Sequence, residues 1–418
     1  MSKDCDKSKI MRRLLWTMGL ILPLGGLLFG YNTAVISSAL IFLKLDFSLT
    51  TLQQELLVSI ILIGALLGAS VAGMLSDRLG RKPVIILCDV FFIVGGLTLL
   101  LANDLFALLI GRLIAGIGVG LASVTVPLYL AELSPSKNRG ALVTLNQLAI
   151  TLGILLAYLV GLLESGEQNW RIMFGLSIIP AVIQLLGMFL LPETPNYLSM
   201  TKEPKSKNSA LFKKTMAGAL IVGLGLAILQ QITGINTIIY YANQIFELAG
   251  FKVGTSAIWA SIGVGSVNVI ATLFSVWLLD RLGRRPLLLV GIAGMTLSLI
   301  VLAATFWFDL PSESLLSVIS LMLYVATFAI GIGPVAWLII SEIYPHQIRG
   351  RAMSLAIFAN WVSNYIVSLT FLTLIEKITS AGAFFLYAAI CGFALHFVYR
   401  FVPETKGKTL KQIEKDLN

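Results

Sequence analysis

The sequence predicts an all-α membrane protein with twelve transmembrane helices. Three observations carry this prediction: the composition, the recurrence of long apolar runs, and the placement of the positive charges. Of the 418 residues, 57% are hydrophobic and only 12% are charged, and the mean hydropathy is +0.91. This composition lies far outside that of soluble domains, so we expect a membrane protein.

Apolar runs recur along the whole chain, and each can cross the roughly 30 Å of hydrocarbon that about 20 helical residues span. Because lipid offers no hydrogen-bond partner to the backbone, and because the runs lack the alternation of barrel strands, we expect helices. The predicted spans are 14–42, 54–75, 84–102, 105–131, 141–163, 171–191, 216–245, 255–280, 286–308, 314–343, 351–375 and 381–402.

The positive charges gather in the two tails and in alternate connections. The formal net charge is +9, and about 25 of the 30 Lys and Arg residues lie in these segments. Under the positive-inside rule, this placement predicts two cytoplasmic termini and argues against nucleic acid as a partner. The first span is too long for a signal peptide and lacks a small-residue cleavage site, so we expect it to remain in the protein.

Neither a disulfide framework nor a metal site is indicated. Cys5, Cys88 and Cys391 show no paired spacing, and no cofactor or metal is expected. The absence of any Asn-x-Ser/Thr acceptor mildly favours a prokaryotic protein, for which the plasma membrane is the bacterial inner membrane. We expect the chain to work as a monomer.

The chain is an internal duplication. The segment from Asp77 to Pro83 (Asp-Arg-Leu-Gly-Arg-Lys-Pro) recurs from Asp280 to Pro286 (Asp-Arg-Leu-Gly-Arg-Arg-Pro). Further pairs match Ala131-Glu132, Pro135 and Arg139-Gly140 with Ser341-Glu342, Pro345 and Arg349-Gly350, and Pro192-Glu193-Thr194 with Pro403-Glu404-Thr405. Each copy holds six spans with its motifs on the same side, so the repeat is parallel, about an axis along the membrane normal.

This duplication predicts a transporter with two six-helix bundles. The predicted parts are an N-terminal bundle at 1–198, a short basic cytoplasmic linker at 199–214, and a C-terminal bundle with a short tail at 215–418. Two equivalent bundles that rock about a midplane site give alternating access, for which an enzyme has no comparable need.

The duplicated loop resembles the signature of the major facilitator superfamily. Gly80 and Gly283 allow a tight turn, and Asp77 and Asp280 are expected to cap neighbouring helices. A simple role in membrane topology is the alternative for the loop taken alone. The expected cytoplasmic charge network comprises Asp77, Arg78, Arg81, Glu132, Arg139, Glu193, Asp280, Arg281, Arg284, Glu342, Arg349 and Glu404.

A narrower resemblance, to the sugar porter family, covers nearly the whole chain. This family includes the facilitative glucose transporters and the bacterial proton–xylose symporters. The matching stretches are Gly30-Tyr31-Asn32-Thr33, Gly111-Arg112, Pro127-x-Tyr129-x-Ala131-Glu132, Asn146-Gln147, Gln230-Gln231-x-Thr-Gly234-Ile235-Asn236, Tyr240-Tyr241, Gly333-Pro334-x-x-Trp337, Asn360-Trp361-x-x-Asn364 and Pro403-Glu404-Thr405-Lys406-Gly407.

Amide side chains are unusually frequent inside the spans of the second half. Such groups are costly in lipid, so they face a bundle interior or a cavity, although for any one of them a helix-to-helix bond is an equal alternative. An amide offers both donors and an acceptor, which suits the hydroxyl groups of a neutral polyol. A Trp such as Trp337 can support the C–H face of a pyranose.

The resemblance implies roles for these residues in sugar transport. The implied sugar contacts are Gln147, Gln230, Gln231, Asn236, Asn268, Trp337 and Asn360, with Tyr240 and Tyr241 in the outer gate. Gly331, Gly333 and Pro334 are expected to let span 10 bend over the ligand, although a kink with only a packing role is the alternative.

The coupling position distinguishes two modes of transport. Proton-driven members of this family carry an acid in span 1 that faces an arginine of span 4. Here the two positions are Asn32 and Arg112, and an amide cannot take up or release a proton. We therefore expect a facilitative uniporter of a hexose such as glucose, with a proton symporter or a non-transporting sugar receptor as alternatives.

Two departures from the family pattern concern the cytoplasmic side. The family usually reads Pro-Glu-Ser-Pro-Arg where this chain has Pro192-Glu193-Thr194-Pro195-Asn196, so one charge pair is expected to be missing. The linker is also too short for the usual cytoplasmic helical bundle. A membrane enzyme is not expected, because no acid pair, metal cluster or activated nucleophile appears. A drug exporter of the superfamily would want an aromatic or acidic cavity instead of amides.

Overall fold

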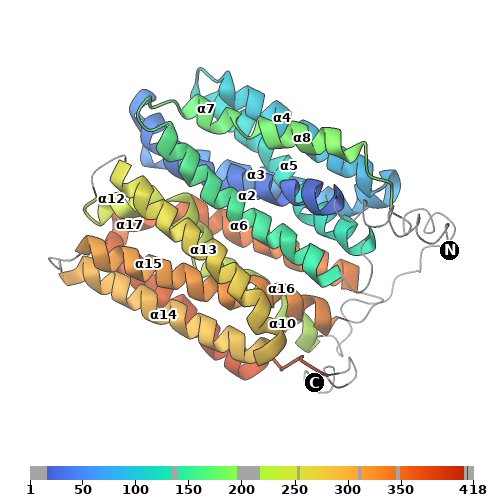
Figure 1. Ribbon diagram of the computed structural model, residues 1–418. Helices are drawn as coiled ribbons and strands as arrows, with labels where there is room; N and C mark the ends of the chain where they lie inside the picture. The colour runs from blue at the N-terminus through green and yellow to red at the C-terminus, as the bar shows by residue number, and fades with distance from the viewer. Residues whose placement is uncertain are drawn as a thin grey trace, which may run out of the picture. The chain divides into compact units, whose positions relative to one another are not determined.

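The computed structural model describes residues 17–133, 139–194, 217–251, 255–308, 313–344, 349–408 and 412. Within these ranges all regular secondary structure is α-helical (Figure 1). Eleven of the described helical segments are long and apolar enough to cross a membrane. The predicted all-α membrane fold is therefore confirmed.

The last helical segment accounts for two of the twelve predicted spans. Helix α17 (Arg349–Phe401) has 53 residues, about twice what one crossing needs. Thr379 interrupts it with φ 67° and ψ 165°, a non-helical conformation that separates a first crossing from a second. The predicted spans 351–375 and 381–402 lie on either side of this residue, so the prediction of twelve crossings holds.

Contacts divide the described chain into two compact units. The first contains residues up to Phe42 and then Ile60–Lys205. Within it, α4 packs on α5, α7 and α8. Its helices are α2 (Pro23–Asp46), α3 (Thr51–Leu79), α4 (Arg81–Leu100), α5 (Leu105–Leu133), α6 (Arg139–Leu163), α7 (Trp170–Gly175) and α8 (Ile178–Met188).

The second unit contains Leu43–Ser59 and the chain from Ser206 onward. The first turns of α3 thus belong to it, and there the Glu55 carboxylate accepts hydrogen bonds from the N–H and the hydroxyl of Thr373, both at 2.7 Å. Its other helices are α10 (Ala217–Ile232), α11 (Ile235–Tyr240), α12 (Ala242–Leu248), α13 (Thr255–Leu282), α14 (Arg284–Phe308), α15 (Glu313–Ile330), α16 (Ile332–Ile343) and α17.

Glycine allows the backbones of α2 and α6 to approach closely. A Cβ atom on Gly30 would lie 1.9 Å from the carbonyl oxygen of Ile150, and one on Gly153 would lie 2.1 Å from that of Leu27. No side chain fits at such distances, so both positions require glycine. Small residues at helix contacts are the usual basis of close packing in membranes, where dispersion between backbones replaces the hydrophobic effect.

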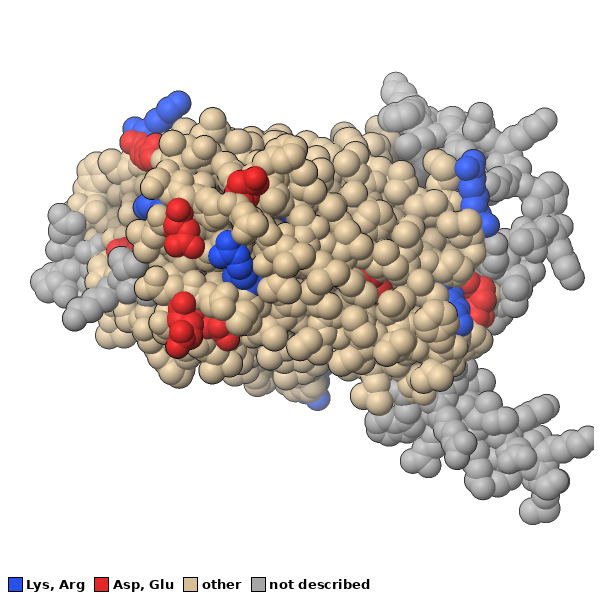
Figure 2. Space-filling view, turned by 90° about the horizontal axis from the view of Figure 1, so that it is seen from above, with Lys and Arg blue, Asp and Glu red and all other residues tan. Residues whose placement is uncertain are grey.

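The outer faces of the helices are apolar and exposed. Large side chains such as Leu67, Leu186 and Val290 are more than half exposed, as expected for faces that meet acyl chains. Figure 2 shows one face of the molecule, on which charged side chains are few and most of the surface is uncharged. This surface agrees with the membrane environment that the composition predicts.

Asp89 is an acidic residue that is buried in the first unit without a hydrogen bond to any described residue. Asp89 of α4 is fully buried, and neither carboxyl oxygen has a hydrogen-bond partner among the described residues. The ionisable side chains of the helices packed on α4 are Arg112, Tyr129 and Glu132 of α5 and Arg171 of α7, and none of them pairs with it. A buried polar group without a partner costs about 1–3 kcal/mol.

We expect Asp89→Val to leave the melting temperature of the detergent-purified protein unchanged or to raise it, because no hydrogen bond is lost and a buried polar group is removed. Tyr31→Phe serves as the control, because it deletes the hydrogen bond from the Tyr31 hydroxyl to the Met173 carbonyl at 2.5 Å. The control should lower stability by about 1 kcal/mol. An equal loss in Asp89→Val would show that Asp89 makes a stabilising contact.

Candidate functional site

Four amide side chains from three helices of the second unit form one hydrogen-bonded network, which we call the amide network. Gln230 and Gln231 lie near the end of α10, Asn236 lies in α11, and Asn360 lies in α17. Asn360 donates to Gln230 Oε1 (2.9 Å), Gln231 donates to Asn360 Oδ1 (3.2 Å), and Asn236 donates to Gln231 Oε1 (2.7 Å). The sequence pattern did indicate these four residues, and the structure brings them together.

The amide network lies beside a break between α10 and α11. Gly234 has φ 97°, a conformation that favours glycine, and the helical hydrogen-bond ladder is interrupted there. The Tyr324 hydroxyl donates to the carbonyl of Thr233 at 2.9 Å, and Asn360 Nδ2 donates to the carbonyl of Ala227 at 2.8 Å. Side chains thus satisfy carbonyl groups near the break, as the membrane interior requires.

A second break separates α15 from α16 at Gly331. Pro334 has no N–H to give to the carbonyl of Ile330, and the Ser275 hydroxyl donates to that carbonyl instead, at 3.3 Å. Gln230 Nε2 donates to the carbonyl of Gly333 at 2.8 Å. Gln230 therefore connects α16, at the second break, to the amide network.

The amide network leaves some hydrogen-bonding capacity unused. Both donors of Gln231 are engaged, with Asn360 and Gln230 as acceptors. Asn236 donates one N–H to Gln231, and its Oδ1 accepts no hydrogen bond from a described residue. Asn236 therefore presents one acceptor and one donor on a half-buried side chain, which is the pairing that a hydroxyl group needs.

Three of the other predicted contact residues do not belong to the amide network. The Asn268 side chain in α13 is buried and makes no hydrogen bond with a described residue. Trp337 in α16 is half-buried. Gln147 is exposed in α6 of the first unit. Within the described part of the second unit, no hydrogen bond joins Asn268 or Trp337 to the four amides.

The two predicted gating tyrosines are buried against α17. Tyr240 accepts a hydrogen bond from Asn364 Nδ2 at 3.2 Å, and Tyr241 donates to the carbonyl of Ser368 at 2.8 Å. The Tyr241 ring also lies 5.1 Å from the ring of Phe371. The spacing of four between residues 364 and 368 places both partners on one face of α17.

Asn32 and Arg112 meet in the interior of the first unit. Arg112 donates to the backbone carbonyl of Asn32 at 2.8 Å, whereas the Asn32 amide donates to the carbonyl of Leu28 at 3.0 Å. The guanidinium group also lies 6.0 Å from the ring centroid of Phe174. Both side chains are almost fully buried, and the Asn32 side chain is directed to its own helix.

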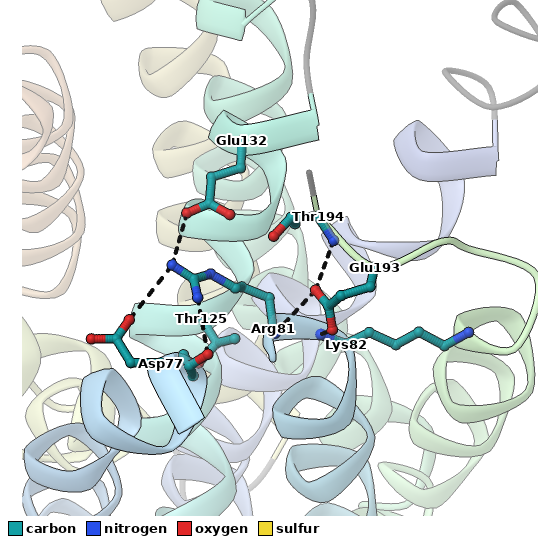
Figure 3. A network of polar contacts seen from close by, with 8 residues as sticks. Asp77, Arg81, Lys82, Thr125, Glu132, Glu193 and Thr194 are labelled. Carbon is teal, nitrogen blue, oxygen red and sulfur yellow. Dashed lines mark hydrogen bonds and ion pairs between the residues drawn. The ribbon is translucent and has the colours of Figure 1, made fainter. Parts of the chain in front are cut away.

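The first copy of the charged motif surrounds the start of α4. Figure 3 shows the Arg81 guanidinium group between Asp77 and Glu132, at 3.6 and 3.0 Å. The Glu193 carboxylate accepts hydrogen bonds from the backbone N–H groups of Arg81 and Lys82, both at 3.1 Å. Glu193 therefore caps α4 and complements its dipole from 112 residues away.

The second copy repeats this arrangement. Arg284 pairs with Glu342 at 3.1 Å, and the Glu404 carboxylate accepts from the N–H groups of Arg284 (3.1 Å) and Arg285 (3.0 Å) at the start of α14. Burial acts to raise the pKa of Glu404, but hydrogen bonds from backbone N–H groups, including that of Lys406 at 2.8 Å, outweigh it and lower the pKa. Gly80 and Gly283 have φ 99° and 92°, as the tight turns require.

The expectation that Asp77 caps a helix is wrong, because in the described part of the chain its side chain pairs with Arg81 and the cap of α4 comes from Glu193. From the sequence, Glu193 was expected to form charge pairs. Its capping role could not be predicted, because the sequence around residue 81 does not indicate which distant residue caps the helix. The side chains of Asp280, Arg139 and Arg349, together with Asn196 and the linker, lie outside the described residues.

Comparison with known proteins gives consistent matches over the whole chain. The family described as sugar (and other) transporter matches residues 18–219 and again 201–417. The glucose transporter GlcP of Staphylococcus epidermidis is 37% identical, with 98% of each chain covered. The galactose–proton symporter of Escherichia coli is 36% identical, with 94% of this chain and 92% of the relative covered.

A solved structure shows the same fold. The inward-open conformation of the xylose transporter XylE from E. coli matches with a TM-score of 0.83 and 32% identity, and the match covers 96% of this chain and 99% of that one. These relatives are transporters and not enzymes, as the sequence predicts. The chain belongs to the sugar porter family of the major facilitator superfamily, and it is a multi-pass membrane transporter of sugar.

Proposed function

We propose that this transporter carries a monosaccharide, a hexose of the glucose type, by facilitative uniport with alternating access. The amide network is the observation that supports a neutral sugar, because its groups donate and accept hydrogen bonds without presenting a charge. The similarity to a glucose transporter agrees with a hexose.

In this proposal the amide network binds the sugar hydroxyls, and its side chains are already held in place before the sugar arrives. Asn236 offers its free acceptor and donor, and Gln231 and Asn360 hold Asn236 in place through the chain of hydrogen bonds. A prearranged network loses little side-chain entropy when the ligand binds. The full set of proposed sugar contacts is Gln147, Gln230, Gln231, Asn236, Asn268, Trp337 and Asn360.

The arrangement around Asn32 supports uniport. A coupling residue must exchange a proton and change its interaction with the arginine during the cycle. Asn32 has no titratable proton, and its side chain bonds to Leu28 while Arg112 holds a backbone carbonyl. The site therefore lacks the chemistry for proton uptake.

A proton-coupled symporter is the second candidate, and Asp89 is the observation that favours it. A fully buried acid within a membrane helix is expensive and is often functional. Asp89 is the residue of α4 that could exchange a proton there. The similarity to a galactose–proton symporter also fits this candidate.

Several further features complete the proposal. The breaks at Gly331, Gly333 and Pro334 let α16 bend during the cycle, and Tyr240 and Tyr241 form the outer gate. Residues 1–198 and 215–418 act as the two moving bundles, joined by the linker at 199–214. Both termini lie in the cytoplasm, the membrane is the bacterial inner membrane, and the monomer transports.

The direct test is uptake of labelled glucose into proteoliposomes, with a panel of unlabelled hexoses, pentoses and inositol as competitors. Glucose and its close relatives should compete best. Strong competition by a pentose or inositol with none by hexoses would contradict the assignment of a hexose. Absence of any sugar flux, together with saturable sugar binding, would instead indicate a receptor.

We expect Asn236→Ala to raise the half-saturation concentration for glucose about 3- to 10-fold, the effect of one lost hydrogen bond. The matched control is Asn243→Ala, which removes a buried amide of α12 whose Oδ1 accepts from Ser261 at 2.6 Å. The control should change thermal stability more than sugar affinity. Equal effects of the two variants on half-saturation would remove Asn236 from the site.

We expect an imposed proton gradient to leave the final sugar level in proteoliposomes at equilibrium with the outside. A uniporter accelerates exchange but cannot drive accumulation. If sugar rises above equilibrium, uniport is wrong, and Asp89→Asn then decides the alternative. Loss of accumulation in Asp89→Asn with exchange retained would assign proton transfer to Asp89.

We expect Asn32→Asp to make sugar exchange depend on pH. An ionised carboxylate has no N–H to donate to the Leu28 carbonyl, so it would turn toward Arg112, whereas the protonated form could keep the present bond. Exchange rates of the variant and the parent, measured between pH 5 and pH 8, check this. A flat profile in both would count against position 32 as the coupling site.

A further inference from the structure

A shallow groove lies on the outer face of α13, toward the end of the helix. Leu273, Phe274 and Trp277 line the groove, which has a volume of about 420 Å³, and each of the three side chains is more than half exposed. The groove is part of a helix that crosses the membrane. Its apolar lining suits hydrocarbon, which surrounds the outer faces of such helices.

A positive charge marks one end of this groove. The Arg281 guanidinium group lies 4.0 Å from the ring centroid of Trp277, and the Arg281 side chain is exposed. Arg281 forms no ion pair with any side chain that the structure describes. Lys406 is also exposed there, and its ammonium group donates to the Arg281 carbonyl at 3.0 Å.

The two carboxylates that the structure describes at this end, Glu342 and Glu404, are already engaged. Glu342 forms an ion pair with Arg284 and accepts a hydrogen bond from the Thr405 hydroxyl. Glu404 accepts hydrogen bonds from the backbone N–H groups of Arg284 and Arg285. The positive charges of Arg281 and Lys406 thus stay uncompensated by these two carboxylates. An anion from outside the described chain would complement them.

We propose that the groove and the two cations form a binding site for an anionic phospholipid. One acyl chain lies along Leu273, Phe274 and Trp277, and the phosphate and the anionic head group lie against Arg281 and Lys406. Trp277 suits the boundary between the two parts, because its ring contacts hydrocarbon while its face supports the guanidinium group. This site is independent of which sugar is carried.

The duplication provides an internal comparison. At the offset of 203 residues, Arg281 corresponds to Arg78, but Trp277 corresponds to Met74 and Phe274 to Val71. The first copy thus keeps the arginine and lacks the aromatic side chains that line the groove. A role in topology or in the charged motif alone would need only the arginine, so the aromatic residues point to a ligand specific to the second unit.

The test measures lipid binding to the detergent-purified protein by native mass spectrometry, with phosphatidylglycerol and phosphatidylcholine of the same acyl chains as probes. We expect tighter binding of phosphatidylglycerol, and a loss of about five-fold in that preference in Arg281→Gln, the effect of one cation at a membrane surface. Trp277→Leu should weaken phosphatidylglycerol binding as well, while glycerol phosphate should not compete.

Two control variants separate this site from general effects. Lys377→Gln removes an exposed cation from a distant part of α17, and Trp259→Leu removes an exposed tryptophan near the other end of α13. Neither should change the lipid preference. Equal binding of the two lipids, or equal effects of Arg281→Gln and Lys377→Gln, would overturn the proposal. The proposal would also be overturned if the protein forms a dimer that Trp277→Leu abolishes, because a second copy of the chain would then occupy the groove.

Discussion

Every backbone carbonyl that a broken helix releases inside the membrane needs another donor, and this requirement organises the second unit. The helical path is interrupted at Thr233–Gly234 and at Gly331, among other places, and side chains from neighbouring helices supply hydrogen bonds to carbonyl groups there. Gln230 donates a hydrogen bond to a carbonyl of α16 and also accepts one from Asn360 within the amide network. The proposed ligand site and the proposed hinge therefore share one side chain.

The sequence was a good guide wherever the physical cause is local. Hydropathy and charge placement predicted twelve crossings, and Gly331, Gly333 and Pro334 predicted the interruption between α15 and α16. Amides in apolar spans could be recognised as costly, so four members of the network were identified without any knowledge of their partners. In each case the feature can be recognised from a few neighbouring residues, because their own polarity or backbone conformation is unusual for a membrane helix.

Features that depend on distant parts of the chain could not be predicted in the same way. The cap of α4 by Glu193 joins residues that are far apart in the sequence, and local reasoning assigned capping to Asp77 instead. The isolation of Asp89 is likewise invisible in the sequence, because it depends on which side chains the neighbouring helices bring near. Nor does the sequence show that Asn236 is the amide with unused donors and acceptors, since its neighbours' hydrogen bonds decide this.

The two glutamate caps also impose an order on biosynthesis. When a ribosome makes this chain, the N–H groups at the start of α4 lack their carboxylate partner until Glu193 emerges, after the last helix of the first unit, and those of α14 lack theirs until Glu404 emerges. In each half of the chain, the residue that caps the helix thus lies near the end of that half. A nascent chain halted before residue 404 would hold a second bundle in which α14 lacks this cap.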